Sequence, residues 1–350
     1  MKKATIKDVA RLAKVSTATV SNVMNNSRFV QQDTREKVLK SMEILNYRPS
    51  NLAKSMKGVG SKVIGLIIPS QEQDSSSELF STLASGVESE LQKAGYQLII
   101  ANSHERVTEE QSRLELFNSS MIEYVDGIII APTSGLLKNI DQIASNTTLP
   151  IVFVDRKPND LERYDVVYTN NYSVTLELLE GIVDRGYEDI IFISGPTDVS
   201  STIERNTAYE KIFYKLNGNK EPKRFETISS FEAGYRIGKE VIDSFEEKRS
   251  AILFGNNTIA MGTIKYLIDH GISIPDDVGI AVYDDYSWME IAQTPLTAIR
   301  QPAFEMGRES AKLILDSINN QEHTTKRVEI PSKIIERKSL WGEKNETEID

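Results

Sequence analysis

The sequence contains no cysteine, only three histidines and no long apolar run. The absence of cysteine excludes disulfide bonds and thiolate metal sites, and the three histidines (His104, His270 and His323) are too scattered to favour a metal cluster. No stretch approaches the length of a membrane span, and the first residues lack the apolar core and cleavage site of a signal peptide. We therefore expect a cytoplasmic protein with no metal, no other cofactor and no membrane partner.

Motifs that carry catalysis are also missing. The sequence has no phosphate-cradling GxxxxGK[ST], no GxGxxG after a strand, no HExxH and no GxSxG. The adjacent pair Asp284-Asp285 is a candidate for acid–base work, but such a pair is more typical of one cleft residue and one turn residue. We therefore expect that the protein is not an enzyme.

Charge is distributed unevenly along the 350 residues. Residues 1–62 contain thirteen Lys or Arg against four Asp or Glu, a net charge of +9, whereas the remainder carries −19 of the total of −10. A basic segment of this density favours a polyanionic partner, because Lys and Arg neutralise phosphates well. A solvated, slightly basic small domain is the alternative.

The basic head shows three helix patterns. Thr5 with a carboxylate three residues later begins the first helix, and Ser16 caps a second helix over Thr17 to Asn25. A third capping pattern at Asp33 begins a helix that stops before Tyr47-Arg48-Pro49. Three short helices with a tight turn between the first two predict a helix-turn-helix domain.

The second of these helices has an unusual outer face. Val20, Val23 and Met24 form one apolar stripe, and the other side carries only uncharged residues, namely Thr17, Ala18, Ser21, Asn22 and Asn25. Asn amides can bond adenine edges, Ser and Thr hydroxyls can serve bases or phosphates, and an Ala methyl can contact a thymine methyl. A well-capped helix in a small bundle would explain the face equally well, but the capping, the turn and the charge together favour a DNA-reading helix.

A short helix is expected next, between Pro49 and Gly58. Helices below about 12 to 15 residues are marginal in water, so this one needs a partner. Leu52 and Met56 lie four apart on one face, and Lys54 suits a phosphate. A frayed linker is the alternative.

The body alternates short apolar runs with helical patterns. The runs are rich in Ile and Val, which predicts parallel strands buried on both faces and hence an α/β body; they are 63–68, 97–100, 127–130, 151–154, 190–193, 251–254 and 278–283. The length suits two such sheets, and a ligand then lies between them at the carboxyl ends of the strands.

The stretches ATIKDVARLAKVSTATVSNVMN and TREKVLKSMEILNYRPSNLAKSMK resemble the head of the lactose-repressor family, most closely its purine-responsive members. The resemblance implies a homodimer on a near-palindromic operator, with the second helix in the major groove and paired hinge helices over the central minor groove. It places Thr17, Ala18 and Asn22 at base-reading positions and Met56 at the wedge position. The further implied DNA contacts are Thr5, Ser16, Ser21, Asn25, Tyr47 and Lys54. The family usually has leucine at the wedge and often Arg or His where Asn22 stands, so its consensus operator cannot be assumed.

The resemblance also extends to the periplasmic sugar-binding fold of the body. It implies a DNA-binding domain at 1–49, a hinge at 50–62, an N-terminal subdomain near 63–166 and 300–325, a C-terminal subdomain near 167–299 and 326–341, and a polar tail at 342–350. The tail has no apolar heptad, so a dimer is favoured over a tetramer.

Six residues are candidates for binding a small-molecule effector. Three are polar residues at strand ends, Asp155, Asn256 and Asp284. By the resemblance, Arg205 has the family spacing after Pro196, and Phe80 and Phe231 match aromatic pocket positions. Carboxylates, an amide, a guanidinium fork and an aromatic face suit a polyol, although each residue singly could be a turn, a cap, an ion-pair member or core.

These observations predict a ligand-responsive transcriptional repressor. The effector is expected to be a sugar, sugar acid or sugar phosphate; a purine and a phosphorylated carrier protein, as in catabolite-control members, stay open. A transport-type sugar receptor would share the body but would need an export signal, and a sugar- or nucleotide-directed enzyme would need a catalytic constellation.

Overall fold

The computed structural model describes residues 6–25, 29–45, 60–70, 76–117, 125–133, 149–158, 161–320 and 322–341. The chain divides into two compact units, a head that comprises residues 1–61 with 120–124, and a body that comprises the rest. Residues 50–59 of the expected hinge (50–62) and the tail 342–350 lie outside the described residues.

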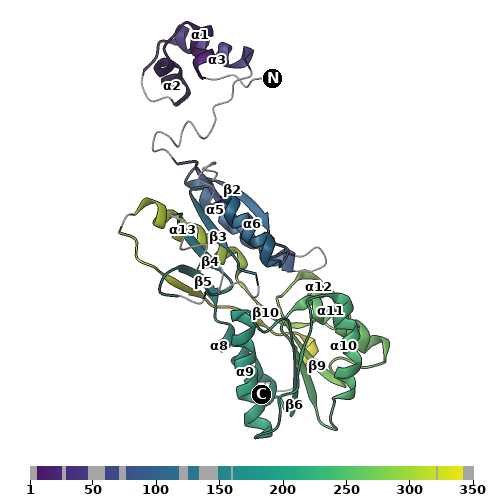
Figure 1. Ribbon diagram of the computed structural model, residues 1–350. Coiled ribbons are helices and arrows are strands. Elements are labelled where there is room, and N and C mark those ends of the chain that lie inside the picture. Colours follow the sequence, from purple (N-terminus) through teal and green to yellow (C-terminus); the bar gives the residue numbers. More distant parts are fainter. Residues whose placement is uncertain are drawn as a thin grey trace, which may run out of the picture. The chain divides into compact units, whose positions relative to one another are not determined.

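The head contains α1 (Ile6–Ala13), α2 (Thr17–Asn25) and α3 (Gln32–Ile44), as drawn in Figure 1. Its core consists of small apolar side chains that come from all three helices: Val9, Ala10, Ala13, Val20, Val23 and Val38. The three predicted helices are therefore confirmed. The expected start of α3 is wrong by a residue or more, because the helix already includes Asp33 in its first turn.

The body has two lobes, each built on a six-stranded sheet. The first sheet has the order β11-β5-β4-β3-β1-β2 and forms what we call the N-lobe. Its strands are β1 (Val63–Ile68), β2 (Gln97–Asn102), β3 (Gly127–Ile130), β4 (Ile151–Val154), β5 (Asp165–Thr169) and β11 (Arg327–Ile330), and its helices are α5 (Ser76–Lys93), α6 (Val107–Phe117) and α13 (Ala303–Asn319). All five strand pairings are parallel.

The second sheet, with the order β12-β10-β9-β8-β6-β7, forms the C-lobe. Its strands are β6 (Asp189–Ser194), β7 (Arg224–Glu226), β8 (Ser250–Phe254), β9 (Val278–Tyr283), β10 (Thr297–Arg300) and β12 (Lys333–Ile335). Its helices are α8 (Asn171–Asp184), α9 (Ser200–Asn217), α10 (Phe231–Asp243), α11 (Asn257–Asp269), α12 (Ser287–Ile291) and α14 (Lys338–Trp341). Only the β10–β12 pair is antiparallel among the pairings of this sheet.

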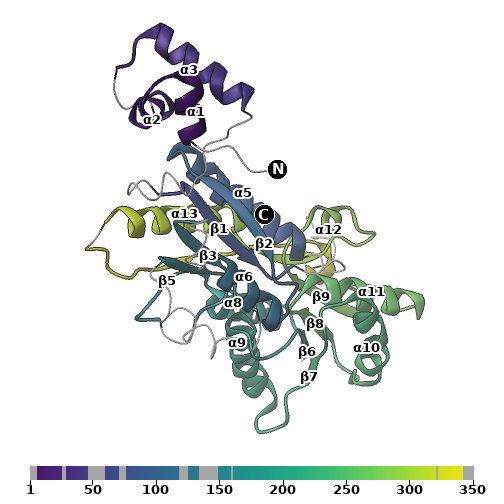
Figure 2. The same cartoon turned by 45° about the horizontal axis from the view of Figure 1, so that its top comes forward.

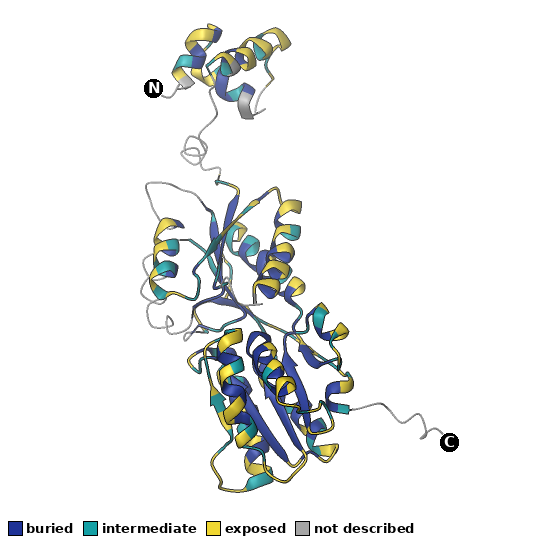
Figure 3. Cartoon of the chain, turned by 90° about the vertical axis from the view of Figure 1, so that its right-hand side faces the viewer, coloured by how far each residue is buried: buried dark blue, intermediate teal, exposed yellow. Residues whose placement is uncertain are grey.

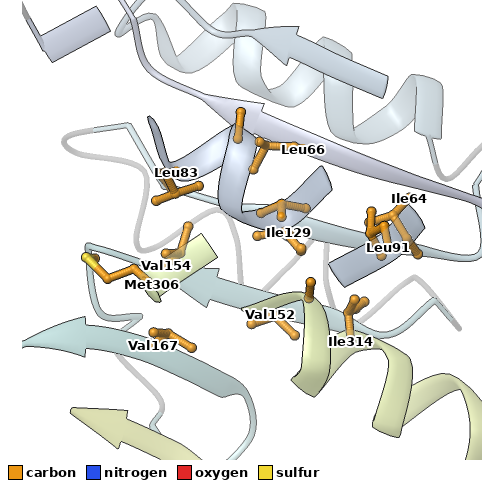
Figure 4. Close-up of a cluster of buried hydrophobic side chains, with 14 of the residues drawn as sticks. Ile64, Leu66, Leu83, Leu91, Ile129, Val152, Val154, Val167, Met306 and Ile314 are labelled. Atoms are coloured by element: carbon orange, nitrogen blue, oxygen red, sulfur yellow. The ribbon is translucent and has the colours of Figure 1, made fainter. Parts of the chain in front are cut away.

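Helices cover both faces of each sheet, which explains the nearly continuous apolar strands. In the N-lobe, α5 and α13 pack on one face and α6 packs on the other. Figure 4 shows the first of these cores, where Leu83 and Met306 face Leu66, Ile129 and Val154. In the C-lobe, α10 and α11 cover one face and α8 and α9 the other (Figure 2). Figure 3 shows strands coloured as buried between helices whose outer sides are exposed. The two-sheet α/β body is confirmed.

Two glycines allow α5 and α13 to approach closely. A Cβ added at Gly86 would lie 2.0 Å from the backbone oxygen of Phe304, and one added at Gly307 would lie 2.0 Å from that of Leu83. Any larger residue would force the helices apart. This contact holds α13 in the N-lobe although the strand before it, β10, belongs to the C-lobe.

The chain crosses between the lobes three times, and two of the crossings lie a few residues beyond the approximate bounds of 166 and 325. β5 extends to Thr169 and β11 occupies 327–330, and both strands belong to the N-lobe. The first crossing therefore follows residue 169 and not 166, and the third follows residue 330 and not 325. Both differences arise because a strand at the boundary pairs with the earlier sheet.

The strand at 97–102 departs from the expected burial on both faces. Ile99 is 43% exposed and Ile100 is 51% exposed, because β2 is the edge strand of its sheet. The other predicted runs are central strands and are buried throughout or nearly so. None of the helices within the described ranges is both long and apolar enough to cross a membrane.

Candidate functional site

The exposed start of α2 is the candidate DNA-reading surface of the head. Thr17 and Ala18 are exposed and Asn22 is half-buried. Ser16 is committed to the helix cap, since its Oγ accepts the backbone N–H of Thr19 at 3.0 Å. Ser21 does not belong to the outer face as expected, because it is only 7% exposed and sits beside the core residue Val20. The side chain of Asn25 and residues Thr5, Tyr47, Lys54 and Met56 lie outside the described part of the chain.

A cavity of about 380 Å³ lies between the two lobes of the body. Residues of both lobes line it, including five of the six effector candidates: Phe80, Asp155, Arg205, Asn256 and Asp284. Phe231 does not line the cavity and is 38% exposed. The hydroxyl oxygen of Ser230 accepts the N–H of Ala233 and fixes the start of α10, so that the loop before Phe231 faces the cavity instead.

Asp155 is the most unusual of these residues. It follows β4 with a left-handed φ of 68° and is 7% exposed. Its carboxylate has no hydrogen-bond donor among the described residues; its one ion contact is to Nε of the adjacent Arg156 at 3.7 Å. Burial raises the pKa of Asp155, and the neighbouring guanidinium groups of Arg156 and Arg205 oppose that shift. A buried acceptor that faces a cavity in this way calls for a donor from a ligand.

Arg205 is held rigidly in the cavity wall. Its Nε donates to Asn171 Oδ1 at 2.8 Å, its Nη1 donates to the backbone oxygen of Gly255 at 2.9 Å, and its guanidinium lies 3.5 Å above the Tyr283 ring. These bonds use two of its five N–H groups, which leaves Nη2 for a ligand. Asn256 caps α11 by accepting the N–H of Ile259 at 3.0 Å, so that its amide nitrogen stays available as a second donor.

Asp284 is the C-lobe counterpart of Asp155. It follows β9, also with a φ of 68°, and accepts a hydrogen bond of 2.6 Å from Nε2 of Gln301. Gln301 lies on the second crossing segment and accepts a hydrogen bond from Thr169, which lies at the first crossing. Asp284, which lines the cavity, is therefore connected through Gln301 to both of these crossing segments. Asp285, by contrast, is paired with Arg300 and Arg337 away from the cavity.

Sequence reasoning missed a cluster of charged residues beside Asp155. Glu105 and Arg156 form an ion pair that lines the cavity, and Arg156 also donates to the backbone oxygen of Pro132 at 2.8 Å. Behind them, both oxygens of the fully buried Glu110 accept the backbone N–H of Thr133, at 3.0 and 3.2 Å. Burial raises the pKa of Glu110 to about 7. No local pattern marks these residues, because their partners are distant in sequence.

A two-lobed body with a polar cavity at the strand ends, joined to a separate helix-turn-helix head, defines the class of ligand-controlled DNA-binding proteins. Residues 5–50 match the family model described as bacterial regulatory proteins, lacI family, and residues 179–340 match a periplasmic binding protein-like domain. The HTH-type transcriptional repressor PurR of Vibrio atlanticus (strain LGP32) is 31% identical over 340 residues, which cover 96% of this chain and 98% of that protein. PurR of Haemophilus influenzae (strain PittEE) is 30% identical with the same coverage.

Solved structures show the same fold. The lac repressor dimer bound to operator and the anti-inducer ONPF superposes with a TM-score of 0.78 at 23% identity, covering 97% of this chain and 99% of that one. The transcriptional regulator CelR in complex with cellobiose has a TM-score of 0.69 at 23% identity, with coverages of 96% and 99%. The chain belongs to the lacI family of bacterial regulatory proteins. It is a ligand-responsive, DNA-binding transcriptional repressor.

Proposed function

We propose that the cavity between the lobes binds the effector, and that the effector is an uncharged polyhydroxylated molecule such as a sugar. The observation that carries this proposal is the buried carboxylate of Asp155, which faces the cavity and accepts no hydrogen bond from the residues that the structure describes. Hydroxyl groups supply donors to Asp155, and they can accept from Arg205 Nη2 and from the amide of Asn256. Phe80 also lines the cavity, although its side chain is only 2% exposed and packs in the core of the N-lobe.

The charges around the cavity favour an uncharged effector over a sugar acid or sugar phosphate. Three carboxylates (Glu105, Asp155 and Asp284) face two guanidinium groups (Arg156 and Arg205), and Arg156 is already paired with Glu105. An anionic group placed against Asp155 would add to the excess negative charge of the cavity, where Arg205 is the one guanidinium group among the described lining residues that is not already paired with a carboxylate. The similar CelR structure, described with cellobiose, agrees with a neutral sugar.

A thermal-shift screen tests this proposal with matched sugars, sugar acids, sugar phosphates and purines. A ligand present at 100 times its Kd should stabilise the protein by about 2.7 kcal/mol. Asp155→Asn should abolish the shift, whereas Asp276→Asn, an exposed carboxylate in the C-lobe, should leave it unchanged. We expect the ligand to be recovered chemically unchanged. An equal shift in Asp155→Asn, or a shift given by anionic ligands alone, would contradict the assignment.

We further propose that two copies of the chain read a near-palindromic operator through the exposed start of α2. Thr17, Ala18 and Asn22 are the proposed base readers, because hydroxyl, methyl and amide groups match base edges in the major groove. Random-site selection should return two related half-sites. Asn22→Ala should lose about 1 to 3 kcal/mol of discrimination at one position of each half-site, whereas Gln31→Ala, an exposed change on another part of the head, should not.

The proposed link between effector and operator runs through the segment 50–58. Met56 is the proposed wedge in the central minor groove, since an apolar and pliable side chain can enter a base step. A coupling of about 1 to 3 kcal/mol would change operator affinity from several-fold to about a hundredfold. Met56→Ala should therefore weaken operator binding far more than effector binding. Equal losses of both would argue against the wedge.

A further inference from the structure

The loop that leaves β4 sends three consecutive charged side chains to three different places. Asp155 faces the cavity, and Arg156 turns back into the N-lobe to pair with Glu105. Lys157 reaches across to the C-lobe, where its ammonium pairs with Glu204 of α9. The left-handed backbone at Asp155 makes this divergence possible, because an extended chain would direct alternate residues to the same side.

Lys157 contacts the C-lobe through its backbone as well as its side chain. Its N–H donates to Ser200 Oγ at 2.8 Å, and its ammonium also lies 3.9 Å from the centroid of the Tyr168 ring in β5. Ser200 and Glu204 lie four residues apart on the first turns of α9, so they share one face of the helix. The Lys157 and Glu204 side chains are 20% and 25% exposed, which reduces screening by solvent.

These three residues are next to the cavity but do not line it. The residues of α9 that do line it are Ser201, Thr202 and Arg205. One face of α9 therefore lines the cavity, and another face of the same helix contacts Lys157. Asp155 and Lys157 lie two residues apart on one loop, and Glu204 and Arg205 are adjacent in α9. Any rotation of the lobes that separates Lys157 from Glu204 therefore also moves Arg205 relative to Asp155.

From this arrangement we infer that Lys157, Ser200 and Glu204 form a latch that stabilises the observed position of the lobes and so sets effector affinity without touching the effector. The inference rests on the proposed effector cavity. A ligand binds more weakly when the binding-competent state of the protein is less populated. Loss of the latch contacts therefore lowers the apparent affinity in proportion to the loss of that state. The latch residues are therefore positioning residues.

The lobe position can be measured in the ligand-free full-length protein by electron paramagnetic resonance. Because the chain has no cysteine, Ser85→Cys in α5 and Lys239→Cys in α10, both at exposed positions, give one spin-label pair across the lobes. Labelled protein is diluted with unlabelled protein so that only pairs within one chain are observed. The wild-type distance distribution is the reference.

Glu204→Lys should introduce a second distance population, with the ratio of wild-type to displaced arrangement falling roughly fivefold, as expected for the loss of one partly buried ion pair. Exchange of the pair, Lys157→Glu with Glu204→Lys, should restore the original distribution. Ser200→Ala should give a smaller displacement and covers the case in which Glu204→Lys does not fold. Glu210→Lys is the matched control, because Glu210 lies on the same helix and pairs with Arg224 inside the C-lobe at 2.7 Å.

Three results separate this inference from the proposed function. A distance distribution that Glu204→Lys and Ser200→Ala leave unchanged overturns the latch, whatever the cavity binds. If the latch variants displace the lobes, and if they weaken binding of the first sugar that stabilises the wild type in proportion to the fraction of the wild-type arrangement that they remove, the latch is supported. If Asp155→Asn retains full binding of that sugar, the cavity assignment fails while the measured lobe displacement still supports the lobe contact.

Discussion

Replacement of Glu110 by glutamine should change how the stability of the protein depends on pH. Burial raises the pKa of this carboxyl from 4.5 to about 7 in the folded protein, whereas the unfolded chain keeps the ordinary value. Between about pH 4.5 and about pH 7, Glu110 is protonated in the folded state and ionised in the unfolded state. The stabilisation from this group is complete below about pH 4.5 and is lost as pH rises through about 7.

The size of the effect follows from the shift. At 1.36 kcal/mol per pKa unit, the wild type should lose up to about 3 kcal/mol from this group between pH 4.5 and pH 8. The amide of Glu110→Gln keeps an oxygen that can accept the Thr133 N–H, but it cannot ionise. As the pH rises from 4.5 to 8, the free energy of unfolding of the variant should therefore increase relative to that of the wild type by up to about 3 kcal/mol. Any constant offset from the new amide N–H groups cancels in this comparison.

Urea denaturation followed by circular dichroism at pH 5 and pH 8 measures this difference. Glu115→Gln is the control, since Glu115 lies on the same helix but is exposed. Parallel pH profiles for the wild type and Glu110→Gln would refute the reasoning, because they would mean that Glu110 titrates alike in the folded and unfolded chain. If Glu110→Gln instead loses stability relative to the wild type as the pH rises, the predicted direction of the Glu110 pKa shift is wrong.

Three further changes test the packing, the caps and the buried charges. Gly307→Ala should lower the free energy of unfolding by about 1 to 3 kcal/mol, because its new Cβ meets the backbone oxygen of Leu83; urea unfolding checks this. Ser16→Ala removes the cap of α2 and should cost the head about 1 kcal/mol in a thermal melt. Asp285→Ala leaves the guanidinium of Arg337 without its buried partner and should cost about 3 to 5 kcal/mol, whereas an unchanged Tm would show that water replaces the carboxylate.

Much of the fold is predictable because local patterns determine it. The three head helices follow from caps and apolar spacing, and the central strands follow from runs of Ile and Val. The errors occur where the answer depends on distant neighbours. An apolar run such as 97–100 looks the same whether its strand is central or at an edge, and the mixed segment 165–169 becomes a strand only because β4 and β11 lie on either side of it.

The candidate site divides in the same way. Asp155 and Asp284 could be predicted, since polar residues that end apolar strands gather at one edge of a parallel sheet. Arg156 and Glu105 could not, because they are 51 residues apart and meet only through the order of the strands. Phe231 was placed by resemblance alone, and the cap at Ser230 turns it outward. The burial of Ser21 could not be predicted, because a small polar side chain fits beside a helix core as readily as on a surface.

The two lobes resemble one another in strand order, although the edge strand β12 is antiparallel and its counterpart β11 is parallel. β4 and β9 each occupy the third place in their sheets, and each is followed by an aspartate with a φ of 68°. A pattern of this kind is what duplication of an ancestral gene segment would leave behind. Substitutions in one lobe can then change which metabolite binds while the other lobe keeps its geometry, so that new ligand specificities can evolve within the same fold.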